Sequence, residues 1–202
     1  MTPKVKSTPD LSLNSKKHQD ARTLGREHFM TWDRNVADRF KDKTEEEIKV
    51  TLKETAFPFA VCFENWINDF NMATGIRNAN AFNLREVFYI GDKRWDRRGA
   101  VGVHNYTEVK WIPSVEEFSK LKERYTIIGI DNLPGSVPLH KHTWCKDTLV
   151  VFGEEGVGLT PAMQSLCSSM VEIPMYGTVR SFNCGVASGI IMHDFISKTN
   201  DG

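Results

Sequence analysis

The sequence lacks the features of a membrane protein, a disulfide-stapled domain or a zinc-bound fold. Its 202 residues contain no apolar run of about 18 residues and no short hydrophobic stretch after a basic start, so neither a membrane span nor a secretory signal is visible. The four cysteines are widely spaced without a Cys-x-x-Cys pair, which favours reduced, mostly buried thiols. We therefore expect a cytosolic protein with one domain and an appendage.

Net charge is absent too, because 26 Lys and Arg balance 26 Asp and Glu. This balance gives no global argument for a nucleic-acid partner, so any basic surface must be local. Residues 1 to 43 hold ten Lys and Arg against six Asp and Glu. The stretch GDKRWDRRG (91–99) is the next basic group, with Lys93, Arg94, Arg97 and Arg98.

Residues 1–55 read as an extension that begins with a disordered segment and continues as helices. The first 20 residues are rich in Lys, Ser, Pro and Asp, a composition typical of frayed chain. Thr44 and Glu47 form a capping-box pattern ahead of a second helix. A first helix is indicated by apolar residues at helical spacing, Phe29, Trp32, Val36 and Phe40. The extension is either a helical pair with a solvated basic face or a nucleic-acid contact.

Residues 56–202 alternate short apolar runs with helical segments. Strands are expected at 57–63, 86–91, 108–112, 125–131, 147–153 and 171–175. Helices are expected at 71–82, 114–124, 160–166 and 183–198. Ser114 and Glu117 form a capping-box pattern for the second of these helices, and Thr160 can cap the third. This alternation predicts an α/β domain with a mostly parallel sheet and helices on both faces. Ligands of such sheets bind beyond the carboxyl ends of the strands.

Unusual residues gather at those ends. In NDFNMATGIR, Asn71 and Arg77 could be a helix cap and a surface side chain. FGEEGVGLTP is a Gly-rich turn from strand to helix without a Walker Lys or G-x-G-x-x-G, and its adjacent carboxylates would repel phosphate. This turn is either a tight connection with solvated Glu154 and Glu155 or a site for a cationic or neutral ligand.

A third cluster, GTVRSFNCGVASG (177–189), opens the last helix with small residues. Each glycine inside a helix costs ~1 kcal/mol relative to alanine, so Gly185 and Gly189 require a compensating close contact. That contact could be another chain segment, a subunit or a ligand. Elsewhere, HKHTWC (140–145) lacks the spacing of a known metal site, so we expect no metal at His140, His142 or Cys145.

Together, the three clusters resemble the SPOUT superfamily, specifically its SpoU or TrmH-like branch of RNA ribose 2'-O-methyltransferases. The resemblance covers residues 57–198. The family motifs are Asn with Arg six residues later, Gly-x-Glu-x-x-Gly-Leu, and Ile-Pro-Met followed by Ser-x-Asn. They match Asn71 and Arg77, Gly153 to Leu159, residues 173–175 and residues 181–183.

The resemblance implies a fold with a C-terminal deep trefoil knot, against which S-adenosylmethionine binds, and a homodimer that pairs through the knot. Small residues would let backbone pass backbone there. The cofactor-binding positions carried over are Ile130, Gly153, Ile173, Met175, Ser181 and Phe182.

The resemblance also implies that Arg77 is the key catalytic residue, with Asn71, Glu155 and Asn183 completing the site. Arg77 would be a general base with a depressed pKa or a clamp on the neighbouring phosphate. No metal is required. The expected substrate is tRNA, because an N-terminal helical extension resembles the tRNA-modifying members. The alternatives are an rRNA ribose methyltransferase, a base methyltransferase of the same superfamily, and a non-catalytic RNA-binding module.

Overall fold

The computed structural model of the chain describes residues 36–65 and 71–199. The positions of Phe29 and Trp32, and the lysine-rich start of the chain, lie outside these residues. The chain divides into two compact units, Met1–Lys41 and Asp42–Gly202. The described part of the first unit contains a 3-10 helix, η1 (Asp38–Phe40), and the second unit begins with helix α2 (Glu45–Glu54) and holds the sheet.

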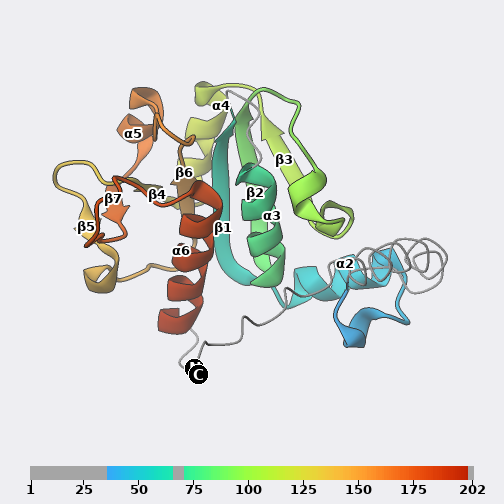
Figure 1. The fold of residues 1–202 in the computed structure, drawn as a ribbon. Helices are drawn as coiled ribbons and strands as arrows, with labels where there is room; N and C mark the ends of the chain where they lie inside the picture. The colour runs from blue at the N-terminus through green and yellow to red at the C-terminus, as the bar shows by residue number, and fades with distance from the viewer. Residues whose placement is uncertain (1–35, 66–70, 200–202) are drawn as a thin grey trace, which may run out of the picture. The chain divides into compact units, whose positions relative to one another are not determined.

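One sheet of seven parallel strands organises the second unit (Figure 1). Its order is β3-β2-β1-β6-β4-β7-β5, so β1 lies between β2 and β6. Every neighbouring pair is parallel, which confirms the predicted sheet. The strands are β1 (Phe57–Asn65), β2 (Leu84–Gly91), β3 (Val109–Ile112), β4 (Thr126–Ile130), β5 (Val137–Pro138), β6 (Thr148–Phe152) and β7 (Ser169–Glu172).

All six expected strands are present, and the differences have local causes. The strand expected at 171–175 is β7, which ends at Glu172. Pro174 follows closely and has no backbone N–H to donate to a ladder. β5 was not predicted, because two residues are too short to show a hydrophobic period.

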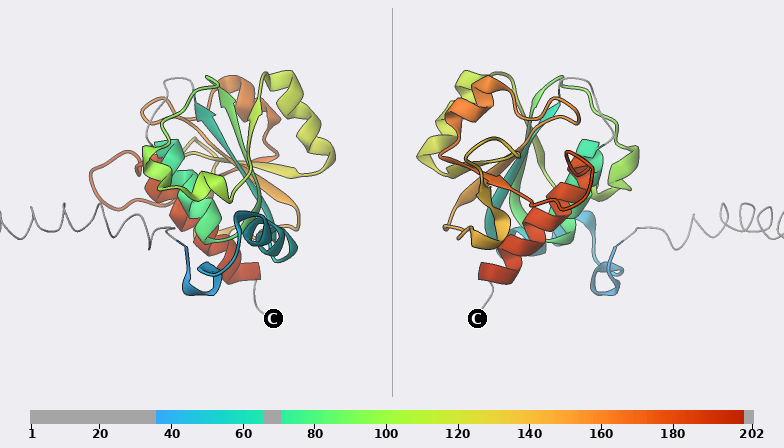
Figure 2. Two further views of the ribbon diagram at one scale, coloured as in Figure 1. Left: turned by 90° about the vertical axis from the view of Figure 1, so that its right-hand side faces the viewer. Right: turned by 60° about the vertical axis from the view of Figure 1, so that its left-hand side comes forward.

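Helices cover both faces of the sheet, as the alternation predicts (Figure 2). α3 (Asn71–Ala81) and α6 (Cys184–Thr199) share one face, where their apolar side chains join one core cluster. α4 (Val115–Ser119) and α5 (Pro161–Leu166) join the second cluster on the other face. The helix expected at 114–124 is divided, because after α4 the chain tightens into the 3-10 helix η4 (Lys120–Glu123). The predicted knot stays a prediction.

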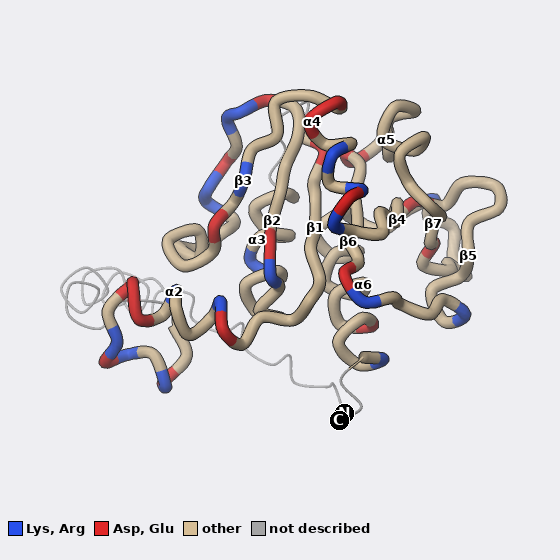
Figure 3. The backbone as a smooth tube through the Cα atoms, turned by 180° about the vertical axis from the view of Figure 1, so that it is seen from behind, with Lys and Arg blue, Asp and Glu red and all other residues tan. Residues whose placement is uncertain are grey.

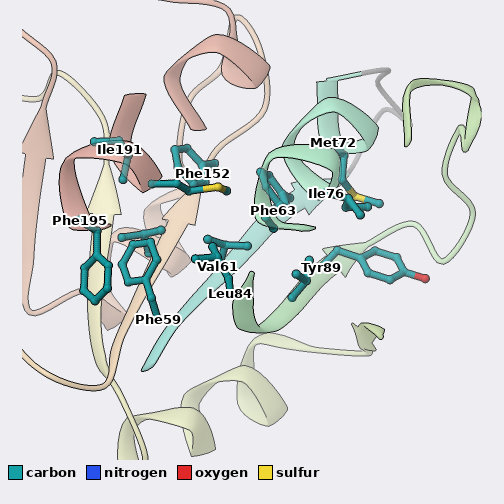
Figure 4. Packing of buried hydrophobic residues seen from close by; sticks show 14 of the residues in the cluster. Phe59, Val61, Phe63, Met72, Ile76, Leu84, Tyr89, Phe152, Ile191 and Phe195 are labelled. Carbon is teal, nitrogen blue, oxygen red and sulfur yellow. The ribbon is translucent and has the colours of Figure 1, made fainter. Parts of the chain in front are cut away.

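Alternation along the central strand β1 separates the two clusters. Phe59, Val61 and Phe63 belong to the cluster on the α3 and α6 side, shown in Figure 4, and Ala60 and Cys62 belong to the other. All five side chains are 1% exposed or less. Because successive strand residues point to opposite faces, the last two residues of β1 also face opposite sides, which matters for the site below.

Helix starts follow the local chemistry of the sequence. The capping box of α2 is present, with Thr44 Oγ1 accepting from Glu47 N and Glu47 Oε2 accepting from Thr44 N. Thr160 caps α5 by accepting from Met163 N at 3.4 Å. Ser114 accepts from Glu117 N, whereas the Glu117 carboxylate pairs with Lys120, so α4 has only half of its expected box.

The four cysteines are free thiols. Burial raises the pKa of the Cys62 thiol, and it raises the pKa of Cys167 to about 11, so both stay protonated at neutral pH. The expectation of mostly buried thiols was wrong, because only Cys62 is buried, Cys167 and Cys184 are half-buried, and Cys145 is exposed. No helix within residues 36–65 and 71–199 has the length and apolar character needed to cross a membrane.

Candidate active site

Three side chains from distant parts of the sequence meet beyond the carboxyl end of the sheet. Asn71 begins α3, Glu155 lies in the loop after β6, and Asn183 directly precedes α6. Asn183 Nδ2 donates to Asn71 Oδ1 at 2.7 Å and lies 3.2 Å from Glu155 Oε2. Asn71 Nδ2 also donates to Glu155 Oε2. The structure thus brings together three of the four side chains that the motifs indicate for the chemistry.

Asn183 also starts the last helix. Its Oδ1 accepts from Val186 N at 3.3 Å and its backbone carbonyl accepts from Ala187 N at 2.9 Å. Its carboxamide therefore faces two ways, with the oxygen on the α6 backbone and the nitrogen on Asn71 and Glu155. This arrangement fixes the side-chain cluster relative to α6.

Arg77, the fourth residue, lies further along α3, about 9 Å from Asn71 at a rise of about 1.5 Å per residue. Its side chain is exposed, and within the described parts of the chain it forms no salt bridge. Asn78, its neighbour, faces α6, and Asn80 bonds Thr107 on the other flank. With about 100° between successive helix residues, Arg77 projects between these two flanks towards solvent.

Glycines shape the loop 153–159, the second motif. Gly156 and Gly158 have φ angles of 90° and 73°, a region that favours glycine. A Cβ added at Gly153 would lie 2.1 Å from the carbonyl carbon of Gly158, so the loop folds back on its own start. The need for glycine at 153 therefore arises within the loop backbone itself, in addition to any ligand beside it.

Two carboxylates that the sequence reasoning missed hold the end of this loop. Asp131, directly after β4, accepts from Leu159 N at 2.9 Å. Glu64, in β1 and 4% exposed, accepts from Thr160 N at 2.8 Å and from Thr160 Oγ1 at 2.6 Å. Both lie at the carboxyl ends of expected strands, and that position is the signal that could have identified them.

A cavity of about 790 Å³ lies beside the loop. Asp131, Glu154, Glu155 and Glu172 contribute carboxylates to its lining, and Arg180 contributes a cation. Such a surplus of negative charge favours a cationic ligand. The lining includes all six residues suggested for cofactor binding, Ile130, Gly153, Ile173, Met175, Ser181 and Phe182.

The small residues of α6 pack against α3. A Cβ added at Gly185 would lie 2.8 Å from Thr74 Cγ2, and one at Gly189 would lie 3.3 Å from Asn78 Nδ2. Asn78 Nδ2 donates to Gly185 O at 2.8 Å and lies 3.0 Å from Ser188 Oγ. The sequence left three possible partners for these glycines. The close contact is with another segment of the same chain, helix α3.

Within the described residues, no group of three His, Cys, Asp or Glu side chains is placed to hold a metal ion. His142 packs edge-on against Trp144, with ring centroids 4.4 Å apart. Burial lowers the pKa of His142. These contacts give the HKHTWC stretch a packing role.

Comparison with known proteins identifies relatives of this chain. The profile of the SpoU rRNA Methylase family matches residues 58–193. The tRNA (guanosine(18)-2'-O)-methyltransferase of Aquifex aeolicus is 24% identical over 159 residues, which cover 76% of this chain and 75% of that protein. The Escherichia coli K12 enzyme of the same name is 27% identical over 66% of this chain, but the match spans only 61% of its own length.

Solved structures share the fold. The A. aeolicus TrmH/SpoU tRNA modifying enzyme superposes with a TM-score of 0.68 at 21% identity, covering 78% of this chain and 83% of that one. The SpoU methyltransferase AviRb from Streptomyces viridochromogenes, in complex with the cofactor AdoMet, gives a TM-score of 0.64 at 22% identity, covering 76% and 62%.

Proposed function

Because the chain belongs to the SpoU rRNA methylase family, we propose that it transfers a methyl group from S-adenosylmethionine to a ribose 2'-oxygen of RNA. The observation that carries this proposal is that Glu155 belongs both to the cavity and to the cluster of polar side chains. This residue lines the cavity that holds all six suggested cofactor positions, and it bonds Asn71 and Asn183. Cofactor and reacting ribose would therefore meet at this carboxylate.

The cavity suits S-adenosylmethionine in charge. The cofactor has a sulfonium and an ammonium group against one carboxylate, and the lining has four carboxylates against Arg180. β7 ends at Glu172, and Glu172 and Ile173 line the cavity, so we expect the backbone of this segment to contact an adenine or ribose. When bound, the cofactor supplies an electrophilic methyl group.

The chain's own residues position the nucleophile. Glu155, fixed by two amide side chains, orients the groups at the reacting end. Arg77 lies outside this cluster and is exposed, which favours a clamp on a substrate phosphate over a general base, because the planar guanidinium presents its N–H donors in a fork that a phosphate can accept. Such a clamp orients the hydroxyl and stabilises the developing negative charge on oxygen.

The substrate we favour is tRNA. The two relatives described above are both named for guanosine 18 of tRNA, and their matches cover 76% and 66% of this chain. The family description names rRNA, which is the alternative. Mapping 2'-O-methylation on tRNA and rRNA from cells with and without the protein tests both. Loss of one ribose methylation without the protein is expected, and unchanged maps would contradict the proposed activity.

We also propose a homodimer that forms through the segment around the third motif and the start of α6. Tyr176, Val179 and Val186 are exposed by 92%, 63% and 52%, a run of apolar surface that a second copy would cover. Light scattering at micromolar protein is expected to give the mass of two chains. A monomer under these conditions would contradict the dimer, and Val186→Glu is expected to shift the population towards single chains.

A further inference from the structure

The loop after β2 concentrates positive charge on the surface. We define the basic loop as residues 91–99, which contain two Asp and four exposed cations. Figure 3 shows these charges along the loop that leads to β3. The cations are Lys93, Arg94, Arg97 and Arg98.

Hydrogen bonds from the sheet hold the backbone of the basic loop. Asn65, the last residue of β1 and 2% exposed, donates through Nδ2 to Asp92 O at 2.8 Å and to Arg94 O at 2.9 Å. Tyr89 donates to Lys93 O at 2.9 Å. The carbonyl groups of three successive loop residues, 92 to 94, therefore accept hydrogen bonds from side chains of the sheet. A loop held in this way presents its side chains without a large ordering cost on binding.

Two cations lie over aromatic rings and form no ion pair with a described carboxylate. Lys93 Nζ lies 5.0 Å from the ring centroid of Trp111, and the Arg97 guanidinium lies 5.7 Å from that of Trp95. Trp111 in turn donates to Gly91 O at 3.1 Å. The rings support the two side chains but leave their charge for an external anion.

The two aspartates engage the other cations. Asp96 accepts from Arg98, and this bond lowers the pKa of Asp96 to about 2, so the carboxylate stays charged at any assay pH. Arg94 is 4.0 Å from Asp92 and its side chain is 89% exposed. Lys93 and Arg97 are therefore the cations best placed to bind a partner.

The basic loop lies beside the helix that carries Arg77. Its last two residues, Arg98 and Gly99, belong to η2 (Arg98–Ala100), which packs against α3, and Ala100 is fully buried there. Across β1, Glu64 holds the end of loop 153–159 while the next residue, Asn65, holds the basic loop. The end of one strand thus positions both the cavity side and the basic side, with α3 between them.

We propose that the basic loop binds phosphates of the RNA substrate next to the target ribose, with Lys93 and Arg97 as the principal contacts. This inference rests on the proposed function, because it takes the partner to be the RNA that is methylated. The ligand chemistry is a row of phosphodiesters. Such contacts add sequence-independent affinity that falls with salt, and they orient the backbone that the Arg77 clamp completes.

The test compares binding of bulk tRNA by three full-length proteins over 50 to 200 mM salt. They are the unchanged chain, the double variant Lys93→Gln/Arg97→Gln, and the control Lys120→Gln/Lys122→Gln, which removes two cations of η4 on the other face. Loss of two phosphate contacts is expected to flatten the log-log salt slope by about 1.4 to 1.8. Over this fourfold salt range, the unchanged chain would then lose about tenfold more affinity than the loop variant.

The control is expected to keep the slope of the unchanged chain, and both variants should keep their affinity for S-adenosylmethionine, which shows that they fold. Asp96→Asn keeps an acceptor for Arg98 N but removes a negative charge, so it should steepen the slope. Equal salt slopes for the loop variant and the unchanged chain would overturn the proposal. An equal flattening of the slope in the control variant would overturn it too, and so would a failure of the unchanged chain to bind tRNA.

A methyl-transfer assay on the same proteins separates this proposal from the proposed function. An unchanged chain that binds tRNA through the loop but transfers no methyl would contradict the function alone. A loop variant that methylates at the normal rate and binds with the normal slope would contradict the loop contact alone.

Discussion

Two regions on either side of β1 differ in almost every respect. The cavity side, beyond β6, β4 and β7, has four carboxylates and one cation. The basic loop beyond β2 has four cations and two aspartates. The chain is neutral overall, so its composition hides both surfaces. Because the two local charges are opposite, one region favours a cationic cofactor and the other favours a polyanionic substrate. Each region thereby disfavours the ligand of the other, although both lie at the carboxyl end of one sheet.

The two regions are also held differently. On the cavity side, carboxylates accept from backbone N–H groups, as Asp131 and Glu64 do with Leu159 and Thr160. On the basic side, an amide and a phenol donate to carbonyls, as Asn65 does with Asp92. The strand-end residues that hold the two regions thus differ in kind, two carboxylates on the cavity side and two neutral donors on the basic side.

The largest expected effect is on chemistry. Arg77→Ala should abolish methyl transfer and leave S-adenosylmethionine affinity within a few fold, because Arg77 lies outside the cavity lining. Single-turnover assays and calorimetry measure the two quantities.

Arg77→Lys sharpens this result. It keeps the charge without the two-pronged geometry, so a phosphate clamp predicts partial activity at raised RNA concentration. Loss of cofactor binding in Arg77→Ala would instead assign Arg77 to the cavity side.

The next effect is on stability. Glu64→Ala removes both acceptors of Thr160, the one for its backbone N–H and the one for its hydroxyl, at a cost of about 1 to 3 kcal/mol for each group left without a partner. Denaturant unfolding measures the loss. Cofactor affinity should fall with it, because the end of loop 153–159 loosens, while the tRNA salt slope should not change.

Glu123→Ala, at an exposed position of η4, is the control and should lie within about 0.5 kcal/mol of the unchanged chain. A Glu64→Ala protein as stable as this control would show that the hydrogen bonds to Thr160 do not hold the loop.

The smallest expected effect concerns the packing of α6 against α3. At Gly185, an added methyl would meet Thr74 at 2.8 Å, so Gly185→Ala should destabilise by about 1 to 3 kcal/mol despite its gain in helix propensity. Gly189→Ala meets only the end of Asn78 at 3.3 Å and should lie within about 1 kcal/mol of the unchanged chain. Equal losses at both positions would contradict the α3 contact as the reason for Gly185.

The fold and family were predictable because their signals are local or ordered along the chain. Strand and helix alternation gave the parallel sheet, and three motifs in order gave the family that the profile match confirms. The caps of α2 and α5 were correct, because a capping residue acts within one turn of its own helix.

Other features depend on residues far apart in the sequence. Thr74 and Gly185 meet only after the sheet has formed, and Glu64 reaches Thr160 across 96 positions. No local pattern marks such pairs. The hydrogen bonds from Asn65 to the basic loop could not be predicted for the same reason, although the charges of the loop are evident in the sequence.

The central claim is that this protein methylates a ribose oxygen of RNA. Its most direct test incubates the purified full-length chain with S-adenosylmethionine labelled in the methyl group and with bulk tRNA or, in a parallel reaction, rRNA, then digests the RNA to nucleosides. The predicted result is label in a 2'-O-methylnucleoside, absent with Arg77→Ala. Label in a methylated base, or none in either tRNA or rRNA, would contradict the account.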